Sequence, residues 1–271
     1  MPPVGGNDVY VKVNGLRAYY EVEGQGESIL LIHGAAQDSL SWRFNIPVLA
    51  EAGYRVYALD LPGHGKSALP SSGPIDDLDT FAAHALDFMD AVGLPRAVVV
   101  GHSMSGGVAL HMALRRRDAV RAAIPVDGAG FTNRTYNEDF FDLVSINPTD
   151  WFEVNFRTIC SPNTLRARVE EIAFDVLRCA PTVAWNDIVA YSRLDLRDRL
   201  ANVQVPVFFI HGGDDWSITP AMGRETQNML RSWTEFAELE GVGHFPHTER
   251  PEVFNAALLG LLRKLGDRTG A

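Results

Sequence analysis

A serine set between glycines is the clearest sign of chemistry in this chain. The run Gly101-His102-Ser103-Met104-Ser105-Gly106 follows an apolar run at 97–100 and precedes small and apolar residues at 107–114. A buried strand that turns into a helix through Gly-x-Ser-x-Gly forms a nucleophile elbow, in which the serine is strained and its hydroxyl projects from the sheet edge. The helix N-terminus there favours developing negative charge. The pattern predicts that Ser103 is a nucleophile, whereas Ser105 falls on the helix side and is interpreted as a packing residue.

A serine nucleophile needs two partners. A histidine within hydrogen-bond distance acts as general base, and a carboxylate fixes the tautomer of that histidine. On a parallel sheet such groups come from loops at the carboxyl ends of strands. His244 lies in a glycine-rich loop after the last expected strand, and Asp214 and Asp215 follow the strand before it. The chain order serine, acid, histidine is the one this sheet topology requires, so a catalytic triad with Ser103 is predicted.

The elements that must position these residues alternate along the chain. A hairpin is predicted first, with strands at 9–13 and 16–22 joined by Asn14-Gly15. Buried strands are then predicted at 28–33, 55–59, 97–100, 121–126, 205–211 and 234–238, and helices at 42–52, 78–92, 107–114, 220–230 and 253–265. This alternation predicts an α/β fold whose mostly parallel sheet is covered by helices on both faces.

One long segment breaks the alternation. From Phe131 to about Leu200 the chain has no strand pattern and is rich in aromatic residues, which is typical of a helical lid. We therefore expect a core domain at 1–130 and 201–271 and a helical cap at 131–200. Most of the aromatic side chains should pack the cap onto the core, and a few should line a pocket. The residues expected at the substrate, from composition and place in the chain, are Phe131, Phe141, Trp151, Trp185, Trp216 and Phe245.

Composition excludes several classes of partner. A formal net charge of −10 argues against nucleic acid and anionic membranes. No apolar run approaches the length of a membrane span, and the amino-terminal residues have neither the basic region nor the apolar core of a secretion signal. Two cysteines are too few for a disulfide framework. We expect a cytoplasmic protein that acts on a small molecule, as a monomer or a homodimer.

Five motifs together resemble the α/β-hydrolase superfamily, in its lidded, esterase-like and haloperoxidase-like form. They are His33-Gly34, Asp60 to Ser67, Gly101 to Gly106, Gly212-Gly213-Asp214-Asp215 with Pro220, and Gly243-His244-Phe245, and they span essentially the whole chain. The resemblance implies an acid three residues after the glycine that ends its strand, which is Asp215. Asp214 stays an alternative, because the spacing to Pro220 is one residue longer than in the family pattern. Asp127 is a second alternative, because some members place the acid after the preceding strand.

The resemblance also implies an oxyanion hole made of two backbone N–H groups. One belongs to Met104, directly after the nucleophile, and the other to the loop after His33-Gly34, with Ala35 as the first candidate and Ala36 behind it. No cofactor is implied. No histidine and carboxylate pair has metal-ligand spacing, so no metal is predicted.

The expected activity is hydrolysis of a carboxylic ester or lactone of a medium-sized apolar or aromatic substrate, through an acyl-enzyme on Ser103. Three alternatives would use the same triad. One is a carbon–carbon bond hydrolase of ring-cleavage products, which usually has an additional arginine in its pocket. The others are a cofactor-free haloperoxidase or perhydrolase, in which peroxide replaces water, and a ligand-binding signalling protein with slow turnover. Epoxide hydrolases and haloalkane dehalogenases use an aspartate nucleophile, and a serine at the elbow disfavours both.

Overall fold

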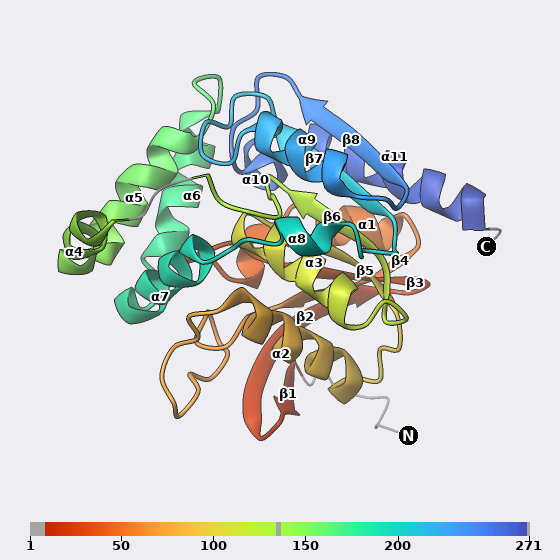
Figure 1. Ribbon diagram of the computed structural model, residues 1–271, viewed down its shortest axis with the longest axis horizontal. Coiled ribbons are helices and arrows are strands. Elements are labelled where there is room, and N and C mark those ends of the chain that lie inside the picture. The colour runs from red at the N-terminus through yellow and green to blue at the C-terminus, as the bar shows by residue number, and fades with distance from the viewer. Residues whose placement is uncertain (1–8, 134–136, 270–271) are drawn as a thin grey trace.

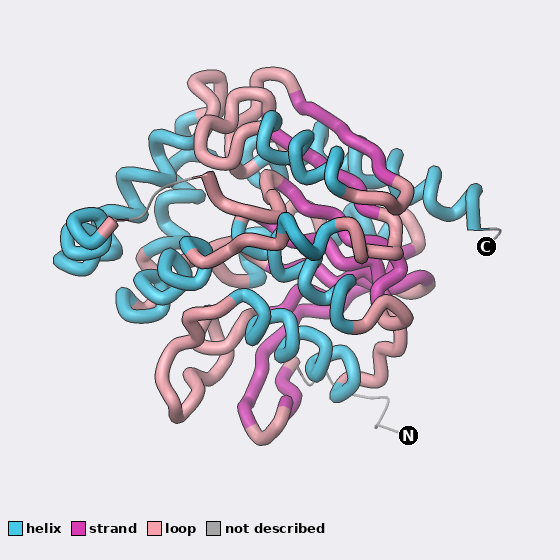
Figure 2. Tube along the Cα trace, viewed as in Figure 1, coloured by secondary structure: helices cyan, strands magenta, loops and turns pink. Residues whose placement is uncertain are grey.

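An eight-stranded sheet runs through the centre of the molecule, with helices on both of its faces (Figures 1 and 2). The computed structural model describes residues 9–133 and 137–269, so the amino-terminal segment, in which no secretion signal is predicted, lies outside the described residues. The strands are β1 (Tyr10–Val13), β2 (Leu16–Gly24), β3 (Glu27–Ile32), β4 (Tyr54–Leu59), β5 (Ala97–His102), β6 (Val120–Val126), β7 (Val207–Gly212) and β8 (Thr234–Leu239). Their order across the sheet is β1-β2-β4-β3-β5-β6-β7-β8.

The sheet is antiparallel at one edge and parallel elsewhere. β2 runs antiparallel to β1 and β4, and every pair from β4 across to β8 is parallel. The hairpin between β1 and β2 turns at Asn14 and Gly15, whose φ angles of 50° and 84° are the left-handed values that a type I′ turn requires. The prediction of a mostly parallel sheet covered on both faces is confirmed.

Helices occupy most of the connections between strands. They are α1 (Ile46–Glu51), α2 (Leu78–Ala91), α3 (Met104–Arg115), α4 (Glu138–Ile146), α5 (Pro148–Ile159), α6 (Arg166–Val176), α7 (Pro181–Ser192), α8 (Arg197–Leu200), α9 (Pro220–Met229), α10 (Pro246–Glu249) and α11 (Pro251–Thr269). A short 3-10 helix at Ser39–Trp42 precedes α1. Within the described residues, no helix combines the length and the apolar composition needed to cross a lipid bilayer.

The helix predicted over 42–52 begins later than expected. The Asp38 carboxylate accepts the Leu40 N–H at 2.9 Å and caps the 3-10 helix, which then ends at Trp42. The α-helix starts only at Ile46, with Pro47 in its first turn. Proline fits there because the first N–H groups of a helix have no acceptor within it.

Successive residues of β3 enter two separate cores. Leu30 and Ile32 pack in the cluster formed with α2 and α3, and Ile29 and Leu31 pack in the cluster formed with α1 and α11. All four side chains are fully buried. A strand covered on both faces has no polar side, which explains why this stretch is a continuous apolar run.

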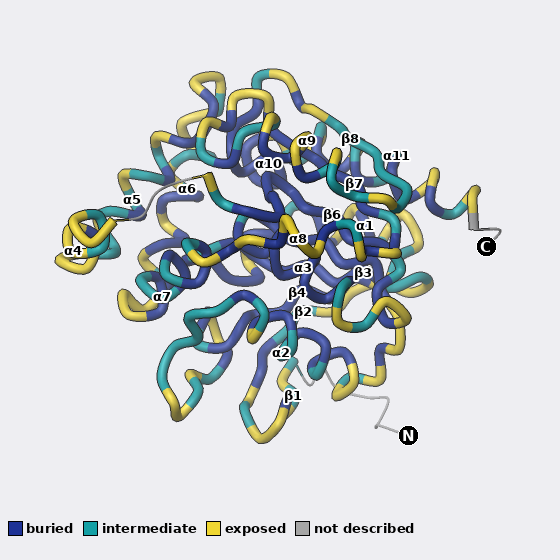
Figure 3. Tube along the Cα trace, in the orientation of Figure 1, coloured by how far each residue is buried: buried dark blue, intermediate teal, exposed yellow. Residues whose placement is uncertain are grey.

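The five helices α4 to α8 lie between β6 and β7 and are called here the insertion. Helices α4 to α7 project to the left of the sheet in Figure 1. Their apolar residues form a third core that also takes in Ala36 and Phe245, which belong to loops at the sheet edge. Figure 3 shows that α4, at the tip, is largely exposed. The division into core and cap domains stays a prediction, but the insertion packs on the same loops that carry the predicted chemistry.

Candidate active site

The turn from β5 into α3 holds Ser103 in a strained conformation. Its φ of 54° and ψ of −120° lie outside the regions that L residues prefer. Neighbouring backbone leaves no room for a side chain at two glycines of this turn, Gly101 on β5 and Gly106 on α3. A Cβ atom at Gly101 would lie 1.9 Å from the Ser105 carbonyl oxygen, and one at Gly106 would lie 2.8 Å from the Gly128 Cα. Sterics therefore require both glycines, and the serine hydroxyl stands at the start of α3.

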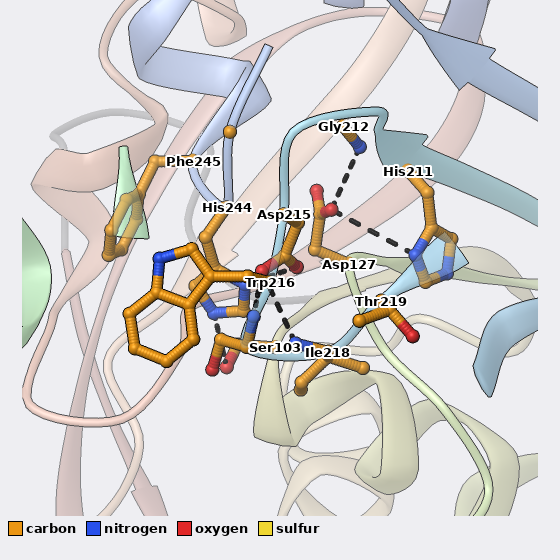
Figure 4. A network of polar contacts seen from close by, with 12 residues as sticks. Ser103, Asp127, His211, Gly212, Asp215, Trp216, Ile218, Thr219, His244 and Phe245 are labelled. Carbon is orange, nitrogen blue, oxygen red and sulfur yellow. Dashed lines mark hydrogen bonds and ion pairs between the residues drawn. The ribbon is translucent and has the colours of Figure 1, made fainter. Parts of the chain in front are cut away.

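Side chains from two other loops meet Ser103 at this turn (Figure 4). The distance from His244 Nε2 to Ser103 Oγ is 3.0 Å, and that from His244 Nδ1 to Asp215 Oδ2 is 2.7 Å. Both the histidine and the aspartate are buried. When Nδ1–H donates to the carboxylate, Nε2 is left as the acceptor for the serine proton. The arrangement has the geometry of a nucleophile, a general base and an orienting acid.

Among the three candidate aspartates, Asp215 is the one that hydrogen-bonds His244 in the described structure. Its second oxygen, Oδ1, accepts the N–H groups of Ser217 at 2.7 Å and Ile218 at 3.2 Å, which fixes the carboxylate in place. Asp214 turns the other way, and its Oδ2 accepts the hydroxyl proton of Ser161 at 2.6 Å. The adjacent aspartates thus have different roles, one at the histidine and one at the insertion.

Asp127 lies between Asp215 on one side and Gly212 and His211 on the other (Figure 4). It is fully buried, its Oδ1 accepts the Gly212 N–H at 2.8 Å, and the same oxygen lies 3.9 Å from His211 Nδ1. Burial and the neighbouring Asp215 raise the pKa of Asp127 well above its ordinary value, and burial lowers the pKa of His211 to about 4. These surroundings favour the protonated form of Asp127 beside Asp215.

Glu249 holds the loop that carries His244. Its carboxylate accepts the N–H groups of Gly243 at 3.0 Å and Phe245 at 2.9 Å, which flank the histidine, and that of Ser161 in the insertion at 2.9 Å. Only 2% of Glu249 is exposed. Charge-assisted hydrogen bonds of this kind are short and strong, so one buried carboxylate fixes the histidine loop and ties it to the insertion.

The backbone N–H groups of Ala35 and Met104 have no acceptor within the described part of the chain. Both residues line the cavity beside Ser103. The Met104 N–H is free because it opens α3, where the first N–H groups lack acceptors within the helix. The Ala36 N–H, the alternative considered from sequence, instead donates to Asp187 Oδ2 at 2.8 Å. Ala35 and Met104 are thus placed to bind a developing oxyanion.

A cavity of about 50 Å³ adjoins Ser103 between the sheet edge and the insertion. Its lining consists of Ala35, Gln37, His102, Ser103, Met104, Trp151, Phe152, Asn155, Phe156, Ile159, Ile188, Tyr191, Ser217, Ile218, His244 and Phe245. Most of these side chains outside the triad are apolar or aromatic. The space beside the nucleophile therefore suits an apolar group.

Four of the six aromatic residues predicted at the substrate do not line this cavity, and that prediction is corrected. They are Phe131, Phe141, Trp185 and Trp216. Phe131 is fully buried, and the guanidinium carbon of Arg197 lies 5.4 Å from its ring centre. Phe141 and Trp185 pack edge to face on each other, with their ring centres 5.4 Å apart. These three side chains pack within the insertion or against its base.

Trp216 follows the acid directly, yet it turns outward. It is 52% exposed, and its indole N–H donates to the Thr158 carbonyl oxygen at 2.9 Å. Trp151 and Phe245 do line the cavity. The composition of the segment could not distinguish the aromatic residues that line the cavity from those that do not, because the inward face of a lid helix is set by its packing on the core.

Helix α5 supplies cavity residues that are not among those predicted. Phe152, Phe156 and Ile159 line the cavity and are buried. Their spacing of four and then three residues is that of one helical face, so helical periodicity is the signal that could have found them. Ile188 on α7 also lines the cavity. It stands in a helix without a clear apolar stripe, and no comparable signal marked it.

Two groups of buried side chains bring metal-ligating atoms within 4.8 Å of one another. They are Asp127, Asp215 and His244, and His64, Cys179 and Asp187. In each group a histidine and a carboxylate already share a hydrogen bond, of 2.7 Å between His244 and Asp215 and 2.9 Å between His64 and Asp187. The same atoms would be needed as metal ligands. The absence of a metal stays a prediction.

Residues 29–257 match the model of a family described as the Alpha/beta hydrolase family. The chain is 33% identical over 258 residues to the dihydrolipoyllysine-residue acetyltransferase component of an acetoin cleaving system from Cupriavidus necator, covering 92% of this chain and 67% of that protein. It is 27% identical over 270 residues to a non-heme chloroperoxidase from Streptomyces lividans, and the match covers 92% of this chain and 97% of that protein. Its fold is similar to that of a thermophilic esterase from Thermogutta terrifontis, with a TM-score of 0.85 and 22% sequence identity. The match covers 95% of this chain and 98% of the esterase.

Proposed function

The chain belongs to the alpha/beta hydrolase family, and we propose that it is a serine hydrolase that cleaves a carboxylic ester or lactone. In this proposal Ser103 is the nucleophile, His244 the general base and acid, and Asp215 the orienting carboxylate. The substrate is a small apolar or aromatic molecule, because the cavity lining is mostly apolar.

Acylation starts at the serine hydroxyl. As Ser103 Oγ forms a bond to the substrate carbonyl carbon, its proton passes to His244 Nε2, which lies 3.0 Å away. The carbonyl oxygen becomes an oxyanion that accepts the Ala35 and Met104 N–H groups. The bond from the carbon to the leaving oxygen then breaks, and His244 returns its proton to that oxygen. The product of this half-reaction is an ester of Ser103.

Deacylation repeats the same chemistry with water. A water molecule gives its proton to His244 as its oxygen attacks the acyl carbon, and the same two N–H groups bind the second oxyanion. The bond to Ser103 Oγ breaks, and the serine recovers its proton from His244. Asp215 stabilises the imidazolium during both halves without taking the proton itself.

One observation carries the proposal. The strained serine, the histidine at 3.0 Å and the aspartate at 2.7 Å from that histidine converge beside two unpartnered N–H groups. Strain at a non-glycine residue costs about 1–3 kcal/mol and persists where function uses it. Packing alone gives no reason for a serine to adopt this conformation.

The test is covalent labelling combined with turnover. The wild-type chain is treated with a fluorophosphonate and digested, and the adduct is located by mass spectrometry, with Ser103 as the expected site. Hydrolysis is then measured on a panel of p-nitrophenyl esters and lactones. Ser103→Ala is expected to lower kcat by roughly 10³-fold or more and to abolish labelling.

Ser105→Ala is the matched control. Ser105 lies two residues away and is also buried, but its hydroxyl donates to the His33 carbonyl oxygen at 2.6 Å and faces no substrate. The Ser105→Ala variant should still be labelled on Ser103 and should keep most of its activity. A label on Ser105, or full ester turnover by Ser103→Ala, would contradict the proposal.

A second candidate is a cofactor-free haloperoxidase or perhydrolase, and the similarity to the chloroperoxidase of Streptomyces lividans favours it. Hydrogen peroxide would then replace water in deacylation and release a peracid. Halogenation of monochlorodimedone in acetate buffer with peroxide and bromide tests this reaction. A carbon–carbon bond hydrolase is less supported, because no arginine is among the described residues that line the cavity.

The same ester panel separates a hydrolase from a ligand-binding signalling protein, which would turn over at most once per many minutes.

A cytoplasmic location is also part of the proposal. It is supported by Cys160 and Cys179, which are buried and free.

A further inference from the structure

The loop that carries the Ala35 N–H leaves that one group unpaired while it satisfies its neighbours. The Gly34 N–H donates to Gln37 Oε1 at 3.3 Å, the Gln37 N–H donates to the Gly34 carbonyl oxygen at 3.4 Å, and the Ala36 N–H donates to Asp187 Oδ2 at 2.8 Å. Within the described structure the Ala35 N–H has no acceptor. The loop is therefore a turn whose conformation selects which N–H group remains available to a ligand.

Asp187 is the outside partner of this turn. It lies on α7 in the insertion, 151 residues away in sequence, and it is fully buried. The residue it holds, Ala36, has a φ of 54°, which is an unfavourable left-handed conformation for alanine. A strained residue relaxes unless a neighbour fixes it, and the bond to Asp187 fixes the peptide group directly after Ala35.

His64 completes the contact. Its Nε2 lies 2.9 Å from Asp187 Oδ2, and its Nδ1 lies 3.2 Å from the Pro62 carbonyl oxygen, so both ring nitrogens face acceptors. Burial opposes a charge on this ring, but the attraction and hydrogen bond of Asp187 outweigh it and raise the pKa of His64. A lone carboxylate so close to the oxyanion loop would disfavour an oxyanion. The raised pKa of His64 favours its protonated form, which offsets that charge.

We propose that Asp187 is a positioning residue for the oxyanion hole: by accepting the Ala36 N–H, it lets the insertion hold the turn in which the Ala35 N–H is left for the substrate. The inference rests on the proposed function and adds to it a physical link between the insertion and the reaction centre. Asp187 does not touch the substrate in this account, because it is absent from the cavity lining.

Two variants of nearly equal size test the acceptor. Asp187 Oδ1 has no partner in the described structure, so Asp187→Asn can place its NH₂ group there and keep an oxygen toward Ala36 and His64. Asp187→Leu keeps the shape and removes the acceptor. Loss of an oxyanion donor costs about 10²- to 10³-fold in rate. Since Leu would misplace the donor and not delete it, we expect kcat to fall by about ten- to a hundredfold with KM changed by less than about threefold, and Asn to restore kcat to within about fivefold.

Val183→Ala is the control for general loosening of α7. Val183 is buried on the same helix and packs near Gly63, and its side chain has no atom that could accept the Ala36 N–H. It should lower Tm while kcat stays within about twofold of wild type. Should Asp187→Leu fail to fold, Asp187→Ser replaces it, because the shorter side chain packs without a clash and no longer reaches the Ala36 N–H.

Amide hydrogen exchange of the 34–37 loop gives a second readout that needs no turnover. Exchange at Ala36 should speed up in Asp187→Leu but not in Asp187→Asn or Val183→Ala. Equal kcat in Leu and wild type, or equal losses in Leu and Asn, would overturn the proposal, as would unchanged exchange at Ala36. If the wild-type chain hydrolyses no ester, the proposed function fails, and the exchange comparison still decides whether Asp187 holds the turn.

Discussion

At the scale of single residues, the identity of the catalytic acid makes a sharp prediction. Asp215→Asn is expected to lower kcat by about 10³- to 10⁴-fold, because an amide can donate to His244 Nδ1 and so select the wrong tautomer. Asp214→Asn changes the adjacent residue, which contacts Ser161 and not the histidine, and should stay within about twofold of wild type. Steady-state kinetics on one p-nitrophenyl ester measures both.

Asp127→Asn extends that comparison to the third aspartate. A neutral amide resembles the protonated carboxyl that burial and Asp215 favour at this position, and its oxygen can still accept the Gly212 N–H. We expect only a small change in kcat. If kcat fell further in Asp127→Asn than in Asp215→Asn, the orienting acid would be Asp127, which follows β6, and not Asp215.

The proximity of Ser103, His244 and Asp215, which form the proposed triad, could be predicted because their positions follow from local rules. Ser103 stands in a strand–turn–helix pattern, and His244 and Asp215 stand after strands whose carboxyl ends share one sheet edge. Asp187 and Glu249 could not be found in this way. Their partners lie 151 and 88 residues away at Ala36 and Ser161, and no local pattern marks a buried carboxylate that accepts a distant N–H group.

At the scale of elements, each parallel strand delivers a loop to one edge, and the insertion covers that edge. The lack of a strand pattern and the many aromatic residues predicted that residues 131–200 form a helical lid, but not which side of each helix turns inward. α5 presents Phe152, Phe156 and Ile159 to the cavity, whereas Phe141 on α4 packs on Trp185. The inward face is set by the loops that the insertion packs against, so it is a tertiary property.

Because Asp175 on α6 is buried, we expect the free energy of unfolding to depend on pH. It is 4% exposed, and burial raises its pKa to about 7, although Arg43 and Arg178 oppose the shift. In the unfolded chain the carboxyl ionises near its ordinary pKa of 3.8. Between these values the folded state binds the extra proton, so the free energy of unfolding falls as pH rises from about 4 to 7.

Asp175→Asn removes this titration. Relative to wild type, the variant should gain stability progressively between about pH 4 and 7 and hold a constant gain above that, on the order of 4 kcal/mol for a shift of about three pKa units. Urea unfolding at pH 4 to 8 measures the difference. Asp142→Asn, at an exposed carboxylate on α4, should show no such trend. A gain that is the same at pH 4 and pH 8 would contradict the expected sign.

At the scale of the whole molecule, the cavity belongs to neither part alone. Ala35 and Phe245 line it from loops at the sheet edge and Met104 from the start of α3. Phe156 and Ile188 line it from the insertion. The hydrogen bonds through Asp187 and Glu249 join the same two parts, one at the turn that holds Ala36 and the other at the loop that holds His244. The size of the cavity is therefore set by how the insertion packs on the sheet. We expect the preference for acyl chain length to depend on the insertion residues that line the cavity.

Ile188→Ala tests this by enlarging the cavity from the insertion side. It removes apolar atoms beside the acyl group, so the ratio of kcat/KM for a hexanoyl over an acetyl p-nitrophenyl ester should rise by roughly tenfold or more, since each methylene in an apolar pocket is worth about 1–3 kcal/mol. Ile172→Ala is the matched control, because Ile172 is fully buried in the same apolar cluster but does not line the cavity. Both variants should lose about 2–5 kcal/mol of stability. A shift in acyl preference shared by both, or shown by neither, would mean that the space beside Ser103 does not select the acyl chain.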